Sequence, residues 1–122
     1  MKISNRNAVK PFITKDESEI REIIAPQNSS LKNQSLAEAR VLPRHSTKEH
    51  YHTQSEEIYY ILKGKGKIKI NDEIKEVKTF DAIPIPPRKR HKIWNTGHGD
   101  LIFLCCCAPA YSDGDTIITE KK

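Results

Sequence analysis

The sequence predicts one all-β domain, a small barrel or jelly roll, preceded by a short helix. From Leu36 onward, short runs with a two-residue hydrophobic period are separated by Gly, Pro, Asn and Asp, which is typical of antiparallel strands. No helical period interrupts these runs, and a chain of 122 residues is the size of a single ordinary domain. We expect the strands to close into a barrel or jelly roll, because closure removes exposed sheet edges.

The first expected element is a short amphipathic helix over residues 15–24. Ahead of it, Thr14 and Glu17 form the capping-box pattern TKDE. Apolar residues then follow at helical spacing and a proline ends the segment: Ile20, Ile23, Ile24 and Pro26. We therefore expect residues 1–34 to form an N-terminal extension that carries this helix, and residues 35–122 to form the β-domain.

The β-domain is expected to contain a hairpin and three later strands. In the run KGKGKIKI at 63–70, Lys alternates with Gly or Ile, Asn71 and Asp72 indicate a turn, and IKEVK at 74–78 returns. The later strands are expected at 82–85, 91–95 and 100–108. This gives about eight or nine strands, as in small barrels and jelly rolls.

One expected strand, IYYIL at 58–62, is apolar on both faces. A sheet with one solvated face normally alternates apolar and polar residues, so something should cover the outer face of this strand. A second copy of the chain is the simplest cover, because symmetric dimers are the commonest oligomers. We therefore expect a homodimer.

The composition bears on the partners of the protein. A net charge of +5 suits phosphate binding, but the densest basic runs, at 63–69 and 88–90, carry no nucleic-acid-binding signature. We interpret them as a solvated surface and expect no nucleic-acid partner. No apolar run approaches the roughly 20 residues that a membrane helix needs, so we expect no membrane partner either.

The N-terminus and the cysteines favour the cytoplasm. The opening residues MKISNRNAVKPF lack the apolar stretch of a secretory signal. The cysteines Cys105, Cys106 and Cys107 are consecutive, which matches neither a disulfide framework nor paired zinc-ligand spacing. By alternation Cys105 and Cys107 share one face, and we expect an interior cysteine to act as a small apolar side chain rather than as a catalytic thiolate.

Histidines and an acidic residue mark a candidate metal site. His50 and His52, in the stretch HYH, point to the same face of a strand. Glu57 lies on the next strand, and His91 begins a later one after a proline-rich turn. If these faces meet in the interior, three imidazoles and one carboxylate form a site for a divalent first-row metal ion.

These residues resemble the two motifs of the cupin family. The first motif is matched by its HXH pair, glutamate and closing glycine, and the second by its proline, histidine and asparagine: His50, His52, Glu57, Gly64, Pro86, His91 and Asn95. Glu56 is the rival for the carboxylate position, but the separation from Gly64 favours Glu57. The chain departs from the family at Arg44, Phe80 and Arg88, where the motifs have glycine, so the shape of these turns is in question.

The resemblance implies a double-stranded β-helix jelly roll with one metal ion per chain on His50, His52, Glu57 and His91. Fe, Mn, Zn, Ni and Cu all suit this set, and a six-coordinate ion would keep two positions open. The resemblance further implies a small metalloenzyme of dioxygenase, isomerase or lyase type, acting on an oxygenated small molecule such as a carboxylate or sugar derivative. A non-catalytic module that binds or stores a small ligand is the alternative.

Several other residues have both a functional and a structural interpretation. Tyr59 shares a face with Glu57 and is the candidate catalytic residue, as a hydrogen-bond or proton donor, although filling the interior is the simpler role. The run 88–90, RKR, either attracts an anionic substrate or is a solvated turn. Trp94 and Phe103 are expected in the core or the pocket wall. We expect His45 and His98 to be exposed rather than ligands.

Overall fold

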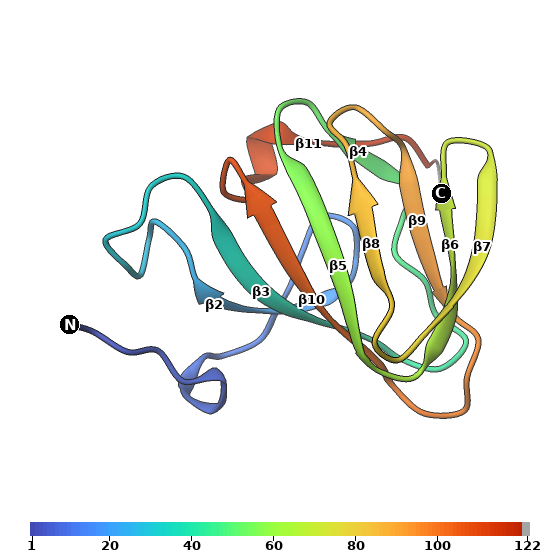
Figure 1. The fold of residues 1–122 in the computed structure, drawn as a ribbon, viewed down its shortest axis with the longest axis horizontal. Coiled ribbons are helices and arrows are strands. Elements are labelled where there is room, and N and C mark those ends of the chain that lie inside the picture. The colour runs from blue at the N-terminus through green and yellow to red at the C-terminus, as the bar shows by residue number, and fades with distance from the viewer. Residues whose placement is uncertain (121–122) are drawn as a thin grey trace.

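The computed structural model of the protein describes residues 1–120 and shows two facing β-sheets (Figure 1). One sheet has the order β1-β2-β3-β10-β5-β8, with bounds Phe12–Ile13, Glu19–Ile24, Ser35–Val41, Leu101–Ala108, Glu56–Lys63 and Ala82–Ile85. The other has the order β11-β4-β9-β6-β7, with bounds Thr116–Ile118, His50–His52, His91–Asn95, Lys65–Ile70 and Glu73–Lys78. The all-β jelly-roll prediction is confirmed, as two sheets rather than one closed barrel.

Alternation along β5 and β10 places the core between the two sheets. In β5, Glu57, Tyr59 and Ile61 are buried, whereas their neighbours face outward. In β10, Leu101, Phe103, Cys105 and Cys107 are buried in the same way, and Cys106 is exposed, as the cysteine alternation predicts. The buried faces of β5 and β10 lie side by side because the two strands pair antiparallel, with Cys105 opposite Tyr59.

The predicted hairpin at 63–78 is present. Strands β6 and β7 pair antiparallel, with Ile70 opposite Glu73. Asn71 adopts a positive φ of 52°, a conformation that asparagine tolerates well. The predicted strands at 82–85 and 91–95 have the expected bounds, and the last one begins one residue later, at Leu101.

The predicted helix at 15–24 is wrong. Residues Glu19–Ile24 form strand β2, which pairs with β3 and places Ile20 opposite Ala39 in the core. The spacing of the isoleucines fits either structure, and pairing with a long neighbouring strand favours the extended one, for which β-branched side chains are well suited. Within the described residues there is no α-helix, only the 3-10 turns η1 (Arg6–Ala8) and η2 (Asp113–Asp115), so no helix there is able to span a membrane.

The capping-box residues instead form a turn between β1 and β2. The Glu17 amide donates to the Thr14 carbonyl at 2.9 Å, and Glu17 has a φ of 72°, which stops helix propagation. Residues 1–34 thus add β1 and β2 to the sheet that contains β3. The division of the chain at residues 34 and 35 stays a prediction.

The three positions where glycine was expected keep a glycine-like backbone. Arg44, Phe80 and Arg88 have φ values of 66°, 77° and 66°. The loops therefore retain the left-handed turn, and the side chains are accommodated by pointing into solvent, since all three residues are exposed.

Candidate metal centre

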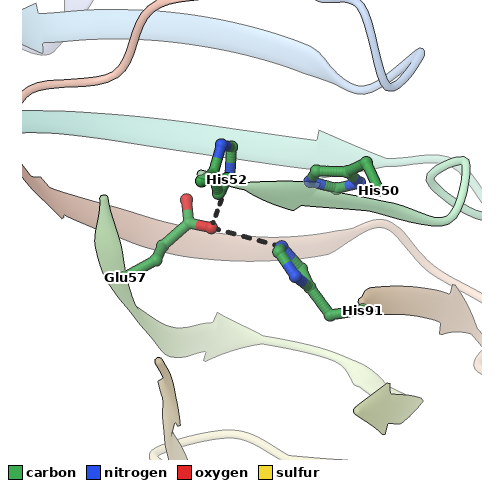
Figure 2. A group of neighbouring side chains, drawn as sticks. All are labelled: His50, His52, Glu57 and His91. Atoms are coloured by element: carbon green, nitrogen blue, oxygen red, sulfur yellow. Dashed lines mark ion pairs between the residues drawn. The ribbon is translucent and has the colours of Figure 1, made fainter. Parts of the chain in front are cut away.

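Three strands bring the four predicted ligands together (Figure 2). His50 and His52 lie in β4 and His91 in the adjacent β9, where His50 and His91 are register partners. Glu57 reaches them from β5 in the opposite sheet. All four side chains are buried, and one ligand atom of each lies within 4.8 Å of the others.

Backbone carbonyls fix the orientation of two of the imidazoles. His50 Nδ1 lies 2.7 Å from the Lys48 carbonyl oxygen, and His91 Nδ1 lies 2.9 Å from that of Lys89. A carbonyl only accepts, so each Nδ1 carries the proton and each Nε2 presents a lone pair to the interior. In both cases the histidine bonds to the carbonyl oxygen of the residue two positions earlier, so the same local hydrogen bond occurs twice.

A hydroxyl orients the third imidazole. His52 Nδ1 lies 3.1 Å from Thr116 Oγ1, and that hydroxyl donates its own hydrogen to the Ser112 carbonyl at 2.9 Å. Thr116 Oγ1 must then accept from His52 Nδ1, so in the neutral form of this imidazole Nε2 is the unprotonated nitrogen. Outer partners of this kind set the tautomer in metal-binding histidines.

The inward-facing atoms lack hydrogen-bond partners. Among the described residues, His52 Nε2, His91 Nε2 and Glu57 Oε1 are buried and unsatisfied. Glu57 Oε1 lies 3.2 Å from His52 Nε2 and 3.4 Å from His91 Nε2, so lone pairs face one another across both gaps. Burying such groups unpaired costs several kcal/mol, on the order of 1 to 3 for each. A cation between them removes this cost, so the residues fit a metal ion.

The charge states of His50 and Glu57 suit metal binding. Burial and the neighbouring His91 lower the pKa of His50 to about 4, so this imidazole is neutral near pH 7. Burial alone would raise the pKa of Glu57, but the interactions with His52 and His91 lower it below its ordinary value, so Glu57 is a carboxylate. Glu57 in turn raises the pKa of His52, against the effect of burial. A neutral imidazole and an ionised carboxylate are the forms that bind metal.

A cavity of about 30 Å³, room for about two water molecules, lies beside the group. Its walls include Tyr59, Phe103, Cys105 and Cys107. The Tyr59 ring packs on Phe103 with centroids 4.6 Å apart, and burial raises the pKa of Tyr59 well above its ordinary value, so its hydroxyl stays protonated. The Cys107 thiol donates to Glu57 Oε2 at 3.2 Å.

Other candidates lie away from the cavity. His45, Glu56 and His98 are exposed, so Glu57 rather than Glu56 is the carboxylate that joins the histidines. Arg88 and Lys89 are exposed and Arg90 is half-buried, and none of the three lines the cavity. Trp94 is half-buried with the Lys92 ammonium 5.2 Å from its ring centroid. Phe103, by contrast, lies in the core and lines the cavity.

Sequence reasoning missed two residues that face the site. Asp16 comes from the β1–β2 turn, and its Oδ2 lies 3.6 Å from His50 Nε2. Tyr111, from the segment after β10, packs edge-on against His52 with centroids 5.9 Å apart. Both reach the site through long-range folding, and neither belongs to a local pattern that could have identified it.

Comparison with known proteins gives one family match and informative relatives. The model of the Cupin domain family matches residues 37–107. An uncharacterized protein of Methanocaldococcus jannaschii is 50% identical over 112 residues, which cover 92% of this chain and 90% of that protein. The oxalate-binding protein of Thermotoga maritima is 32% identical over 90 residues, or 74% of each chain.

A solved structure shares the architecture. The crystal structure of a predicted oxalate decarboxylase from Thermotoga maritima is similar with a TM-score of 0.78 and 25% sequence identity. The similarity covers 88% of this chain and 99% of that one. The β-fold of this chain is therefore shared with that protein over nearly the whole of both chains.

Proposed function

The chain belongs to the cupin family, and we propose that it is a metalloenzyme with one divalent transition-metal ion on His50, His52, Glu57 and His91. The observation that carries the proposal is the set of buried, unpaired atoms that converge from two sheets. A protein with no use for a cation would gain stability by replacing these groups with apolar ones. Three imidazole nitrogens and one carboxylate oxygen suit Fe, Mn, Ni, Cu or Zn.

The substrate of the proposed enzyme is a small oxygenated molecule. A bound ion of this kind would act as a Lewis acid or a redox centre for isomerisation, lyase or oxygenation chemistry. The chain's own contribution comes from the cavity wall. Tyr59 stays protonated and is positioned to donate a hydrogen bond to a molecule in the cavity, while Phe103 and Cys105 exclude water. The 25% identical predicted oxalate decarboxylase supports an enzymatic role.

A non-catalytic ligand-binding protein is the second candidate. The relative from Thermotoga maritima that is 32% identical is named for binding oxalate. The Tyr59 ring is buried against Phe103 and His91, which is also what a purely structural residue would show. Turnover of a bound ligand is the property that separates the two candidates.

Elemental analysis tests the metal site. Protein purified without a metal-affinity tag should contain close to one equivalent of a transition metal, and the double variant H50A/H52A should contain none. A variant of the exposed histidines, H45A/H98A, is the matched control and should keep the metal. Absence of metal in the unaltered protein after anaerobic reconstitution would overturn the proposal and leave a ligand-binding fold.

We also propose that the protein is a cytoplasmic homodimer. The dimer proposal is supported by the outer face of β5, where Ile58, Tyr60 and Leu62 are 50%, 37% and 38% exposed. These side chains are apolar and adjacent on one face, an arrangement that marks an interaction surface when it is contiguous. The cytoplasmic proposal is supported by three free cysteines.

A further inference from the structure

The turn between β1 and β2, residues 14–18, forms one wall of the metal-site cavity. It is fixed within itself, because the Thr14 amide donates to the Ser18 carbonyl at 3.0 Å. It is also anchored on both sides of the site. The Lys48 amide donates to the Asp16 carbonyl at 2.8 Å, and Lys15 Nζ donates to the Thr116 carbonyl at 2.9 Å. Lys48 precedes His50 and Thr116 orients His52, so the turn is tied to the segments that carry two of the ligands.

The hydrogen bonds of the turn hold the Asp16 carboxylate in one orientation. Oδ1 accepts from the Thr14 hydroxyl at 2.5 Å, the Ser18 amide at 3.1 Å and the Ser18 hydroxyl at 2.7 Å. Oδ2 makes no hydrogen bond within residues 1–120 and points to His50 Nε2 at 3.6 Å. The Asp16 side chain is 13% exposed. One oxygen is therefore saturated, and the other is a free acceptor aimed into the site.

The charged side chains that line the cavity include acidic residues but no lysine or arginine among the described residues. Three carboxylates line it, those of Asp16, Glu22 and Glu57. A divalent ion balanced by Glu57 and Asp16 has no net positive charge left for an anion. A ligand with its own carboxylate would then meet Asp16 Oδ2 without a counter-charge, whereas a hydroxyl or amine would donate to it.

We propose that Asp16 determines specificity at this site: its free oxygen accepts a hydrogen bond from a hydroxyl or amine of the metal-bound ligand and excludes carboxylate ligands. The inference rests on the proposed metal site and names the ligand class for it, a small neutral or cationic alcohol or amine. This ligand class differs from oxalate, the dicarboxylate for which the Thermotoga relative is named. The cavity of about 30 Å³ restricts the ligand to a molecule of few atoms unless the turn moves.

Ligand titrations of the cobalt-loaded protein test the proposal without an activity assay. Visible absorption of bound Co(II) reports ligand exchange, so the dissociation constants of formate and of ethanolamine can be measured directly. Asp16→Asn keeps an acceptor for Thr14 and Ser18 and replaces the free oxygen by an amide that donates. We expect this variant to bind formate about tenfold or more tightly than the unaltered protein does and to bind ethanolamine about tenfold more weakly.

Glu17→Gln is the matched control, because it removes the same charge from the neighbouring residue, whose side chain is 55% exposed and faces Lys48. It should change neither dissociation constant. Asp16→Ala is a second variant, which should also relieve the exclusion of formate. Equal formate affinities in the unaltered protein and both Asp16 variants would overturn the role of Asp16 while the metal site stands. Failure of the unaltered protein to bind Co(II) would instead overturn the proposed function itself.

Discussion

The Cys107 thiol donates a hydrogen bond to Glu57 Oε2 at 3.2 Å, while the other oxygen of the same carboxylate faces His52 and His91. The two residues are register partners on β10 and β5. One carboxylate oxygen is thus held by the protein and the other is left for a cation. The expectation that an interior cysteine acts as a small apolar side chain is too narrow here, since this thiol positions a proposed ligand.

Cys107→Ala should weaken metal binding. Loss of the thiol leaves Glu57 Oε2 without a donor, and removal of such outer partners costs about 10- to 100-fold in metal affinity. Cys107→Ser keeps a donor and should retain most of the affinity. Cys106→Ala, on the exposed face of the same strand, is the control. The affinity for Zn(II) is measured by competition with a chromogenic chelator, and equal values for all four proteins would contradict the positioning role.

The metal-free protein should lose stability as the pH falls from about 6.5 to about 4. The folded-state pKa of His50, about 4, lies below its unfolded value of 6.5. Between these values His50 binds a proton in the unfolded chain but not in the folded protein, so this residue favours unfolding in acid, by on the order of 3 kcal/mol over the window. The raised pKa of His52 offsets part of this effect. Urea denaturation in EDTA at several pH values measures the slope.

The variant His50→Ala should show a much shallower slope in this pH window, because it lacks the imidazole that must stay neutral in the folded state. His98→Ala is the control, since its imidazole is exposed and should leave the slope unchanged. A slope in His50→Ala as steep as that of the unaltered protein would assign the acid sensitivity to other groups.

Phe80→Gly should stabilise the protein. Phe80 has a φ of 77° and is 73% exposed, so the side chain contributes little packing and the backbone is in a conformation that glycine adopts more easily. A left-handed conformation costs a non-glycine residue about 1 to 2 kcal/mol, and the greater entropy of unfolded glycine offsets about half of that. We expect a net gain of about 0.5 to 1 kcal/mol in the free energy of unfolding. Phe80→Ala should give no gain, and a gain of equal size would point to the exposed ring instead.

Ile58→Lys should dissociate the proposed dimer. Ile58 is 50% exposed on the outer face of β5, and a charge there is costly to bury between two molecules. Ile74→Lys, at a position 55% exposed in the other sheet, is the control and should stay dimeric. Light scattering coupled to size exclusion gives the masses. A monomeric unaltered protein at micromolar concentration would refute the dimer.

Local patterns were enough to predict most strands of the β-domain, but not that the four proposed ligands meet. Strand alternation places His50 and His52 on one face, and Glu57 on one face with Tyr59, without saying that these faces meet. The cupin motifs supplied what alternation lacks, the association of His91 with them. The exposed turn at Arg88 shows the limit, because its backbone is left-handed and arginine is not a residue that indicates such a conformation.

The N-terminal prediction failed because the decisive interactions are long-range. Ile20 pairs with Ala39 on the neighbouring strand β3, and no local sequence pattern indicates that pairing. Asp16 was not identified as a site residue for the same reason, since a residue in the first turn of the predicted helix would be expected to face solvent. Once β2 joins the sheet, the preceding turn lies against His50, and an acidic residue becomes part of the site.

The hydrogen bond between the Thr116 and His52 side chains links the candidate metal centre to β11, the last strand of the described residues. Synthesis proceeds from the N-terminus, so β4, β5 and β9 are all made before Thr116. Before Thr116 is synthesised, His52 Nδ1 lacks this hydrogen-bond acceptor, and either imidazole nitrogen is free to carry the proton. In such a nascent chain the tautomers of His50 and His91 would be fixed by hydrogen bonds, whereas that of His52 would not. Preparing all three imidazoles for the proposed ion therefore requires synthesis of the chain as far as Thr116.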